Sequence, residues 1–320
     1  MRRRVYDRRP YLLLAVIILL WGSNYIVARV LTGVSPIRVS GVLYAFFRYL
    51  LGTVTMLVVI LRQGKGFSRI RTEVRPYRSL LGLSAVLSAV FVVTTHMSAE
   101  HLPAGTTSLI VNLSPVVVLL FGVLFLHEPL STSRVLGFLL GFAGGFLFLC
   151  ASLTSSLGSD HGLELGLGLA LAGMLSWAAY TIVLQYLERA DCYIVMTAKH
   201  AVSTVIVLPF VAVLAYGGSP LILVIDVWST AGLLFAGVFA SGVAYVLYFR
   251  AVAQLGASRA SSFLFLVPFV SIAGDFFLRE PPTLLAILAG SVALVGVALV
   301  RRSGRQQAET LHDATSSQLT

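Results

Sequence analysis

Ten apolar segments of about 20 residues divide most of the chain, and their length constrains the fold more than any other feature. An α-helix of about 20 residues crosses the roughly 30 Å hydrocarbon core of a bilayer. Because 58% of the residues are hydrophobic and only 11% are charged, too few polar side chains remain to coat a soluble globule. The segments also lack the polar alternation of membrane β-strands. We therefore predict an all-α integral membrane protein with ten transmembrane helices. These are expected at residues 11–31, 41–61, 78–97, 104–126, 134–152, 163–184, 193–215, 228–249, 258–278 and 283–300.

The basic residues are distributed unevenly between the two sides of the predicted bundle. With the N-terminus placed in the cytoplasm, 18 of the 23 Lys and Arg residues fall on the inner side, and only Arg38 and Arg279 on the outer side. This excess is typical of cytoplasmic loops, so we expect a multi-pass protein of the cell membrane with both termini cytoplasmic. The basic residues flank helices, so the net charge of +10 indicates contact with anionic membrane lipids and no nucleic-acid partner. Residues 1–10 are a basic N-terminus and residues 301–320 a polar tail.

The sequence also contains an internal repeat. A proline, about a dozen apolar residues and a Glu-Pro pair occur twice, beginning at Pro115 and at Pro268. We place the repeats at residues 11–152 and 163–300. Two copies of five helices must insert in opposite orientations, and inverted repeats give a transporter two equivalent ways to open. The residues that match at a nearly constant offset are Trp21 and Trp177, Arg48 and Lys199, Ser88 and Ser241, Ala104 and Ala257, Pro115 and Pro268, and Glu128 and Glu280.

Short motifs occur in the same order in both halves. The first half contains Trp21-Gly22-Ser23-Asn24-Tyr25, Phe47-Arg48-Tyr49, Ser114-Pro115 and Glu128-Pro129-Leu130; the second contains Trp177-Ala178-Ala179-Tyr180, Gly256-Ala257-Ser258, Val267-Pro268 and Glu280-Pro281. In these motifs the chain resembles the EamA family of the drug/metabolite transporter superfamily. The resemblance implies two inverted five-helix halves around a cavity lined by helices 1, 3, 4, 6, 8 and 9, with helices 5 and 10 at the periphery. It also implies transport of amino acids, related metabolites or drugs, often outward.

Matching helix faces predict what lines such a cavity. Trp21, Asn24 and Tyr25 share one face of the first helix, and Trp177 and Tyr180 share the corresponding face of the sixth. Aromatic side chains with a polar tip suit moderately apolar organic solutes, although the same residues are also common in helix cores. Hydroxyl groups on the third and eighth helices either bind solute or join neighbouring helices. The other candidate substrate-binding residues in these and the fourth helix are Ser88, Asn112, Tyr245 and Tyr248.

Two prolines and one pair of charges are candidates for moving parts. Pro115 and Pro268 lie within predicted helices, and a proline removes a backbone donor and bends the helix. We interpret the bends as hinges at the cavity or as simple packing kinks. Arg29 and Asp275 lie near the outer ends of their helices, where they either pair as an external gate or are solvated. His96, at the end of the third helix, is expected to be solvated.

Arg48, Lys199 and His200 are ionisable residues inside predicted spans, where charge is costly enough to suggest function. One interpretation makes them anchors for a carboxylate or another anion, with His200 changing charge near neutral pH. The other makes Arg48 and Lys199 structural, with their long stems reaching the membrane interfaces or bonding helix-end carbonyls.

Together these features predict a secondary transporter that exports small organic metabolites, amino acids or amphipathic compounds, by alternating access. One alternative is a carrier of anionic, phosphorylated or carboxylated, metabolites that uses Arg48 and Lys199; another is a non-transporting receptor or scaffold. The sequence has no nucleotide-binding loop, catalytic cluster or metal-ligand spacing, so we expect no enzyme activity, cofactor or metal. Asp275, His96 and His200 are the candidate proton carriers. Proton coupling remains open, as does the choice between monomer and homodimer.

Overall fold

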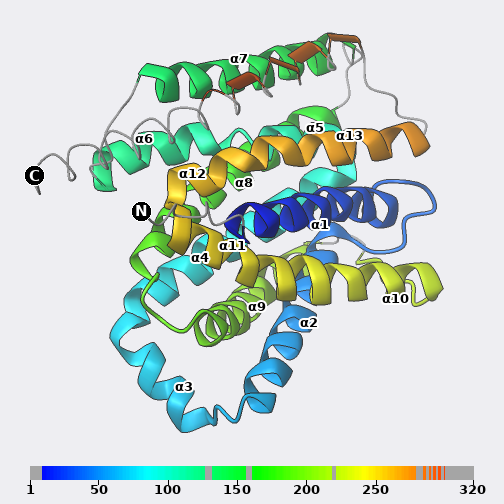
Figure 1. Ribbon diagram of the computed structural model, residues 1–320. Coiled ribbons are helices and arrows are strands. Elements are labelled where there is room, and N and C mark those ends of the chain that lie inside the picture. Colours follow the sequence, from blue (N-terminus) through cyan, green and yellow to red (C-terminus); the bar gives the residue numbers. More distant parts are fainter. Residues whose placement is uncertain are drawn as a thin grey trace, which may run out of the picture.

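The computed structural model describes residues 9–126, 132–155, 161–217 and 221–278, with short helical stretches between 284 and 299. Within these ranges the regular structure is helical, apart from one isolated antiparallel bridge between Val39 and Leu223. The prediction of an all-α membrane protein is therefore confirmed for the described part of the chain. Its elements (Figure 1) are α1 (Arg9–Thr32), α2 (Gly41–Arg62), α3 (Phe67–Val74), the 3₁₀ turn η1 (Arg75–Tyr77), α4 (Arg78–His101), α5 (Ala104–Val111), α6 (Ser114–Leu126), α7 (Thr132–Ser155), α8 (His161–Tyr186), α9 (Cys192–Tyr216), α10 (Val227–Leu234), the π-helix η2 (Phe235–Val243), α11 (Ala244–Leu255), α12 (Ala257–Ser262), the 3₁₀ turn η3 (Phe263–Leu266) and α13 (Val267–Phe277).

Eight helical segments in the described residues are long and apolar enough to cross a membrane. Of the two remaining predicted spans, that at 134–152 falls within α7, whose apolar stretch Val135–Gly144 is shorter than a full span. The other, at 283–300, lies largely outside the described residues, as do both Glu-Pro pairs. The eight candidate spans are Pro10–Thr32, Gly41–Arg62, Phe67–His101, Ala104–Gly122, Gly162–Tyr186, Cys192–Tyr216, Val227–Leu255 and Ala257–Phe277.

Polar side chains cap two of these helices where the chain enters them. The carboxylate of Asp191 accepts hydrogen bonds from the backbone N–H groups of Tyr193 and Ile194 at the start of α9. Asp226 and Ser229 form a reciprocal capping box at the start of α10. Both arrangements satisfy donors that the first turn of a helix leaves without partners.

The spans that contain Pro115 and Pro268 are both interrupted, as the sequence predicts, whereas α9 continues through Pro209. The fourth predicted helix divides into α5 and α6 at Asn112 and Leu113, immediately before Pro115. The ninth divides into α12 and α13, with the 3₁₀ turn η3 between them and Pro268 in the first turn of α13. A proline has no backbone N–H to continue the helical ladder and fits best near a helix start.

The helices of the two halves pack in matched pairs. The contact of α1 with α11 has a counterpart in the contact of α8 with α4, and that of α1 with α13 has one in α8 with α6. The contact of α2 with η2 corresponds to that of α9 with α4. In Figure 1, α5 and α13 lie side by side and α7 lies at the edge of the bundle, against α5 and α6. This peripheral position of α7 agrees with what the family resemblance implies for the fifth predicted helix.

Candidate functional site

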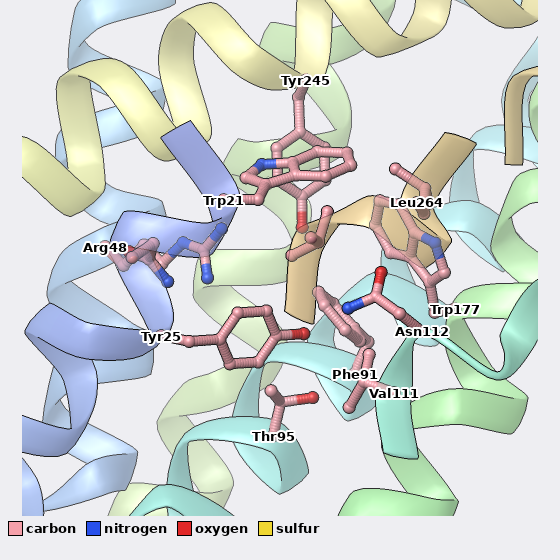
Figure 2. Close-up of a pocket in the computed structure, with 12 residues that line it drawn as sticks. Trp21, Tyr25, Arg48, Phe91, Thr95, Val111, Asn112, Trp177, Tyr245 and Leu264 are labelled. Atoms are coloured by element: carbon pink, nitrogen blue, oxygen red, sulfur yellow. The ribbon is translucent and has the colours of Figure 1, made fainter. Parts of the chain in front are cut away.

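A narrow cavity lies where the two halves meet. Its volume is about 20 Å³, which is room for about one water molecule. In Figure 2, Tyr25 and Asn112 direct their polar ends towards its centre, and the guanidinium of Arg48 approaches from one side. The cavity is lined by Trp21, Asn24, Tyr25, Arg48, Phe91, Thr95, Val111, Asn112, Trp177, Tyr245, Leu264 and Val267.

A cluster of aromatic rings closes this cavity. The indoles of Trp21 and Trp177, one from each half, meet edge to face with ring centroids 5.0 Å apart. The ring of Tyr245 lies 5.6 Å from Trp21 and 5.8 Å from Trp177, also edge to face. Tyr180 and Tyr248 lie behind them against Trp177, at 5.2 and 5.3 Å. Edge-to-face contacts at these distances are favourable, so the cluster holds the cavity narrow.

Arg48 is buried beside the cavity and is held by neutral groups. Its Nε donates to Ser241 Oγ at 2.8 Å, its Nη1 to His96 Nε2 at 3.0 Å and its Nη2 to the Ala240 carbonyl at 3.3 Å. Only 3% of its surface is exposed, so the interpretation that its stem reaches the membrane interface is wrong for this conformation. Within the part of the chain that the structure describes, none of its contacts is a carboxylate.

His96 has a different environment from the one that the sequence suggested. The expectation of a solvated histidine is wrong, because its side chain is 1% exposed and packs against the ring of Tyr44. Arginine has only donors, so Nε2 must accept from Arg48, which leaves Nδ1 to donate to the Val92 carbonyl at 2.6 Å. The imidazole in this network is therefore neutral. Its position one turn before the end of α4 suggested an interface, and no sequence signal indicated the arginine partner.

The π-helix η2 supplies the acceptor that joins Trp21 and Arg48. The Ala240 carbonyl accepts from Trp21 Nε1 at 2.9 Å as well as from Arg48. In a π-helix the backbone hydrogen bonds run to the fifth residue, and such segments are frequent at functional sites.

Lys199 lies in a second polar cluster, behind Tyr245. Its Nζ is completely buried, donates to Ser88 Oγ at 2.9 Å and lies 4.0 Å from the centre of the Tyr245 ring. His200 Nε2 is 3.4 Å from the same Nζ, and its Nδ1 bonds the Met196 carbonyl at 2.8 Å. Lys199 and His200 are therefore neighbours of the cavity without lining it, and the stem of Lys199 does not extend to an interface.

Each of the two buried cations makes a hydrogen bond that crosses between the halves. Arg48 of the first half bonds Ser241 of the second, and Lys199 of the second half bonds Ser88 of the first. Both the cations and the serines are matched positions of the sequence repeat. The duplication is thus visible in the side-chain contacts of the core.

The structure brings seven of the predicted residues to the cavity: Trp21, Asn24, Tyr25, Arg48, Asn112, Trp177 and Tyr245. Ser88, Tyr180, Tyr248, Lys199 and His200 lie in the surrounding shell. Sequence reasoning missed the apolar lining residues Phe91, Val111, Leu264 and Val267, which resemble any other core residue, and the buried tyrosines Tyr44 and Tyr49.

The proposed gate residues, Arg29 and Asp275, contact neighbouring segments of the chain, the end of α4 and the start of α5. Arg29 donates to the carbonyls of Ala99 and Glu100, both at 3.2 Å, and Asp275 Oδ2 accepts from the Gly105 N–H at 2.8 Å. These contacts do not test a gate, so the pairing of Arg29 with Asp275 stays a prediction. Among the described residues, no group of three His, Cys, Asp or Glu side chains is placed to hold a metal ion.

Family comparison identifies the class of protein. A model of the EamA-like transporter family matches residues 8–150 and again residues 164–302. The chain belongs to the EamA-like transporter family. It is therefore a multi-pass membrane transporter and not an enzyme, and the double match indicates internal duplication. Membership also removes the receptor or scaffold alternative.

Relatives of this EamA-like transporter are similar to it over at least 90% of its length. The uncharacterised transporter YvbV of Bacillus subtilis (strain 168) is 29% identical over 93% of both chains. A probable terminal-alkyne amino-acid exporter of Streptantibioticus cattleyicolor is 25% identical over 90% of this chain and 92% of its own. A solved crystal structure shares the fold with a TM-score of 0.67 and 17% sequence identity, and covers 93% of this chain and 98% of that one.

Proposed function

We propose that this transporter exports amino acids or similar amphipathic metabolites from the cell by alternating access. The observation that carries the proposal is the contact between Trp21 and Trp177, because matched residues from the two halves meet at the cavity. A similarity of 25% to a probable amino-acid exporter supports the substrate class and the direction.

The proposed architecture is ten helices in two inverted halves, residues 11–152 and 163–300, in the cell membrane with both termini cytoplasmic. The matched helix contacts and the crossed Arg48–Ser241 and Lys199–Ser88 bonds support a two-fold relation between the halves. An odd number of helices in each half makes that relation an inversion. The breaks before Pro115 and Pro268 then serve as the hinges on which the halves rock.

Substrate binding in this proposal requires the aromatic cluster to open. A cavity of about 20 Å³ is far smaller than an amino acid, so Trp21 and Trp177 must separate in the loaded state. The polar groups that then face substrate include Asn24, Asn112 and Thr95. Among the described residues, Thr95 Oγ1 is buried without a hydrogen-bond partner, and a substrate amine or carboxylate would satisfy it.

The test is counterflow in proteoliposomes. Purified protein is reconstituted into vesicles that are loaded with unlabelled L-phenylalanine or L-leucine. Entry of the same tritiated amino acid into the vesicles is then followed. We expect counterflow by the wild type and a loss of at least about tenfold for Trp21→Ala and Trp177→Ala, since each removes half of the aromatic contact. Trp228→Ala is the matched control, because Trp228 lies in α10 and is 71% exposed. Absence of counterflow by the wild type, or an equal loss in all three variants, would contradict the proposal.

A second candidate is transport of anionic metabolites, as the sequence also suggests. Arg48 favours it, because a permanent cation lines the cavity with only neutral described partners. Flux of glucose 6-phosphate and of succinate in the same vesicles separates the two candidates. Exchange of these anions without exchange of amino acids would favour the second.

A further inference from the structure

Of the two buried residues Arg48 and Lys199, only the lysine is able to lose its proton, since arginine remains charged in proteins. Its Nζ is fully buried, and its described contacts are Ser88, His200 and the rings of three tyrosines. None of these contacts is with a carboxylate. The matched residue in the first half is Arg48, so the two equivalent positions differ in whether they can exchange a proton.

A continuous chain of hydroxyl groups joins Lys199 to the cavity. Lys199 Nζ donates to Ser88 Oγ at 2.9 Å, Ser88 Oγ is 2.6 Å from Tyr49 Oη, and Tyr49 Oη is 2.8 Å from Tyr245 Oη. Tyr245 lines the cavity, beside Trp21 (Figure 2). Each hydroxyl can accept one hydrogen bond while it donates another. Tyr49 Oη also lies 3.1 Å from the Ser88 carbonyl, so the chain carries a proton when the phenolic hydrogen of Tyr49 points along the chain and away from that carbonyl.

We propose that Lys199 is the proton-binding site of this transporter and that Ser88, Tyr49 and Tyr245 conduct its proton to and from the cavity in exchange for substrate. This inference rests on the proposed transport function. In the release step the ammonium gives one proton to Ser88, while Ser88 passes its own hydroxyl proton to Tyr49 and Tyr49 passes its own to Tyr245. Tyr245 gives its phenolic proton to water or substrate in the cavity. One proton leaves, each hydroxyl keeps one, and Lys199 becomes a neutral amine.

Other titratable groups lie close to Lys199 and could bind the exchanged proton in its place. His200 is adjacent on α9, Nε2 facing Lys199 Nζ at 3.4 Å, and is the alternative carrier. The titratable or charged groups from the other packed elements are Arg48 and Tyr49 of α2, His96 of α4, Tyr180 of α8, and Tyr245 and Tyr248 of α11.

The sequence allows a direct measurement, because the chain contains only two lysines, Lys65 and Lys199. Protein labelled with ¹⁵N and ¹³C in lysine alone gives two side-chain NMR signals, and a Lys65→Arg variant assigns them. Lys65 forms an ion pair with Asp191 outside the cavity, so it is the internal reference. We expect the Lys199 signal to change between the ammonium and amine positions within the pH range in which the protein stays folded. A Lys199 signal that stays at either position throughout that range would overturn the proposal.

Transport supplies the second readout. In vesicles with the membrane potential clamped at zero, one-for-one exchange with a proton lets a one-unit pH gradient sustain about tenfold accumulation of tritiated L-phenylalanine or L-leucine. We expect this ratio to fall to about one in Lys199→Arg and Lys199→Met, and Tyr49→Phe to slow the approach to it. Tyr193→Phe, outside the hydroxyl chain, should keep the wild-type ratio.

The outcomes separate the two proposals. Wild-type counterflow with no response to the gradient, or a wild-type response in Lys199→Arg, overturns the role of Lys199 but leaves transport intact. Loss of the gradient response in His200→Gln, with Lys199→Arg unaffected, would assign the proton to the histidine and likewise overturn it. Absence of any wild-type counterflow contradicts the amino-acid substrate, while the lysine NMR titration still decides the proton site.

Discussion

Arg48 in α2 donates a hydrogen bond from Nε to Ser241 Oγ in η2, across the boundary between the two halves, at 2.8 Å. The residues matched to them by the repeat, Lys199 and Ser88, make the corresponding bond at 2.9 Å. Each half therefore supplies one cation and one hydroxyl to the other. A bond that joins the halves in this conformation must lengthen or break if the halves rock apart.

We expect Ser241→Ala to destabilise the protein by about 1.5–3 kcal/mol, the usual contribution of a hydrogen bond to a charged group. Ser84→Ala is the matched control, because Ser84 is equally buried but bonds only the Leu81 carbonyl of its own helix. Its loss should cost about 0.5–1.5 kcal/mol. Thermal unfolding in detergent measures both. A Ser241→Ala protein at least as stable as Ser84→Ala would contradict the importance of the crossed bond.

Gly22 marks a close approach of α1 to α13. A Cβ placed there would overlap the side chain of Val270 and crowd the Val267 carbonyl, whereas a Cβ at Gly82 would meet nothing within 4 Å. Gly22→Ala should therefore cost about 1–3 kcal/mol through overpacking. Gly82→Ala should stabilise α4 by about 0.5–1 kcal/mol through the loss of glycine's backbone freedom. Opposite shifts of the unfolding temperature are expected, and shifts of the same sign would argue against the tight contact.

Asp226, which caps α10 outside the spans, predicts a specific pH dependence. The backbone N–H of Ser229 donates to its carboxylate, and this holds the pKa of Asp226 below its usual range. A depressed folded pKa contributes stability that is present above the unfolded value, near pH 4, and is lost as pH falls through the folded value. Asn at this position keeps the cap without the charge. The stability difference between wild type and Asp226→Asn should thus be positive at pH 7 and should shrink below about pH 4. A difference that does not vary with pH would exclude this carboxylate as its source.

The inverted arrangement predicts the sidedness of three exposed loops. In a variant whose native Cys150 and Cys192 are replaced by serine, single cysteines at Gln63 and Glu188 should react with an impermeant maleimide only from the cytoplasmic side. A cysteine at Ile225 should react only from the outside. Opposite sidedness for positions 63 and 188 would rule out the proposed topology.

The sequence predicted the all-helical membrane fold because a bilayer leaves so few alternatives for apolar segments of this length. It also predicted the interruptions at Pro115 and Pro268, since proline removes a backbone donor from the helix. The loss of this donor does not always break a helix, because α9 continues through Pro209. Helical spacing and the repeat placed Trp21 and Trp177 on matching helix faces, while their direct contact came from the structure.

The partners of the buried polar groups could not be read in the same way. His96 precedes the end of α4, and only the packing of α2 against α4 brings Arg48 to its ring. The sequence did not indicate the π-helix η2 either, because its mixture of Phe, Val, Ala, Gly and Ser is common in transmembrane helices. The assignment of Lys199 to a cluster behind Tyr245 depended on this packing as well.

The nine-residue π-helix η2 has a mechanical consequence. It is wider than an α-helix and contains more residues in each turn. A shift of one residue towards α-helical geometry would therefore rotate the residues that follow it by about 100° about the helix axis. Tyr245 and Tyr248 lie two and five residues beyond its last residue. A change from π- to α-helical geometry in this one segment would thus rotate both phenol rings together about the helix axis, without any helix having to tilt.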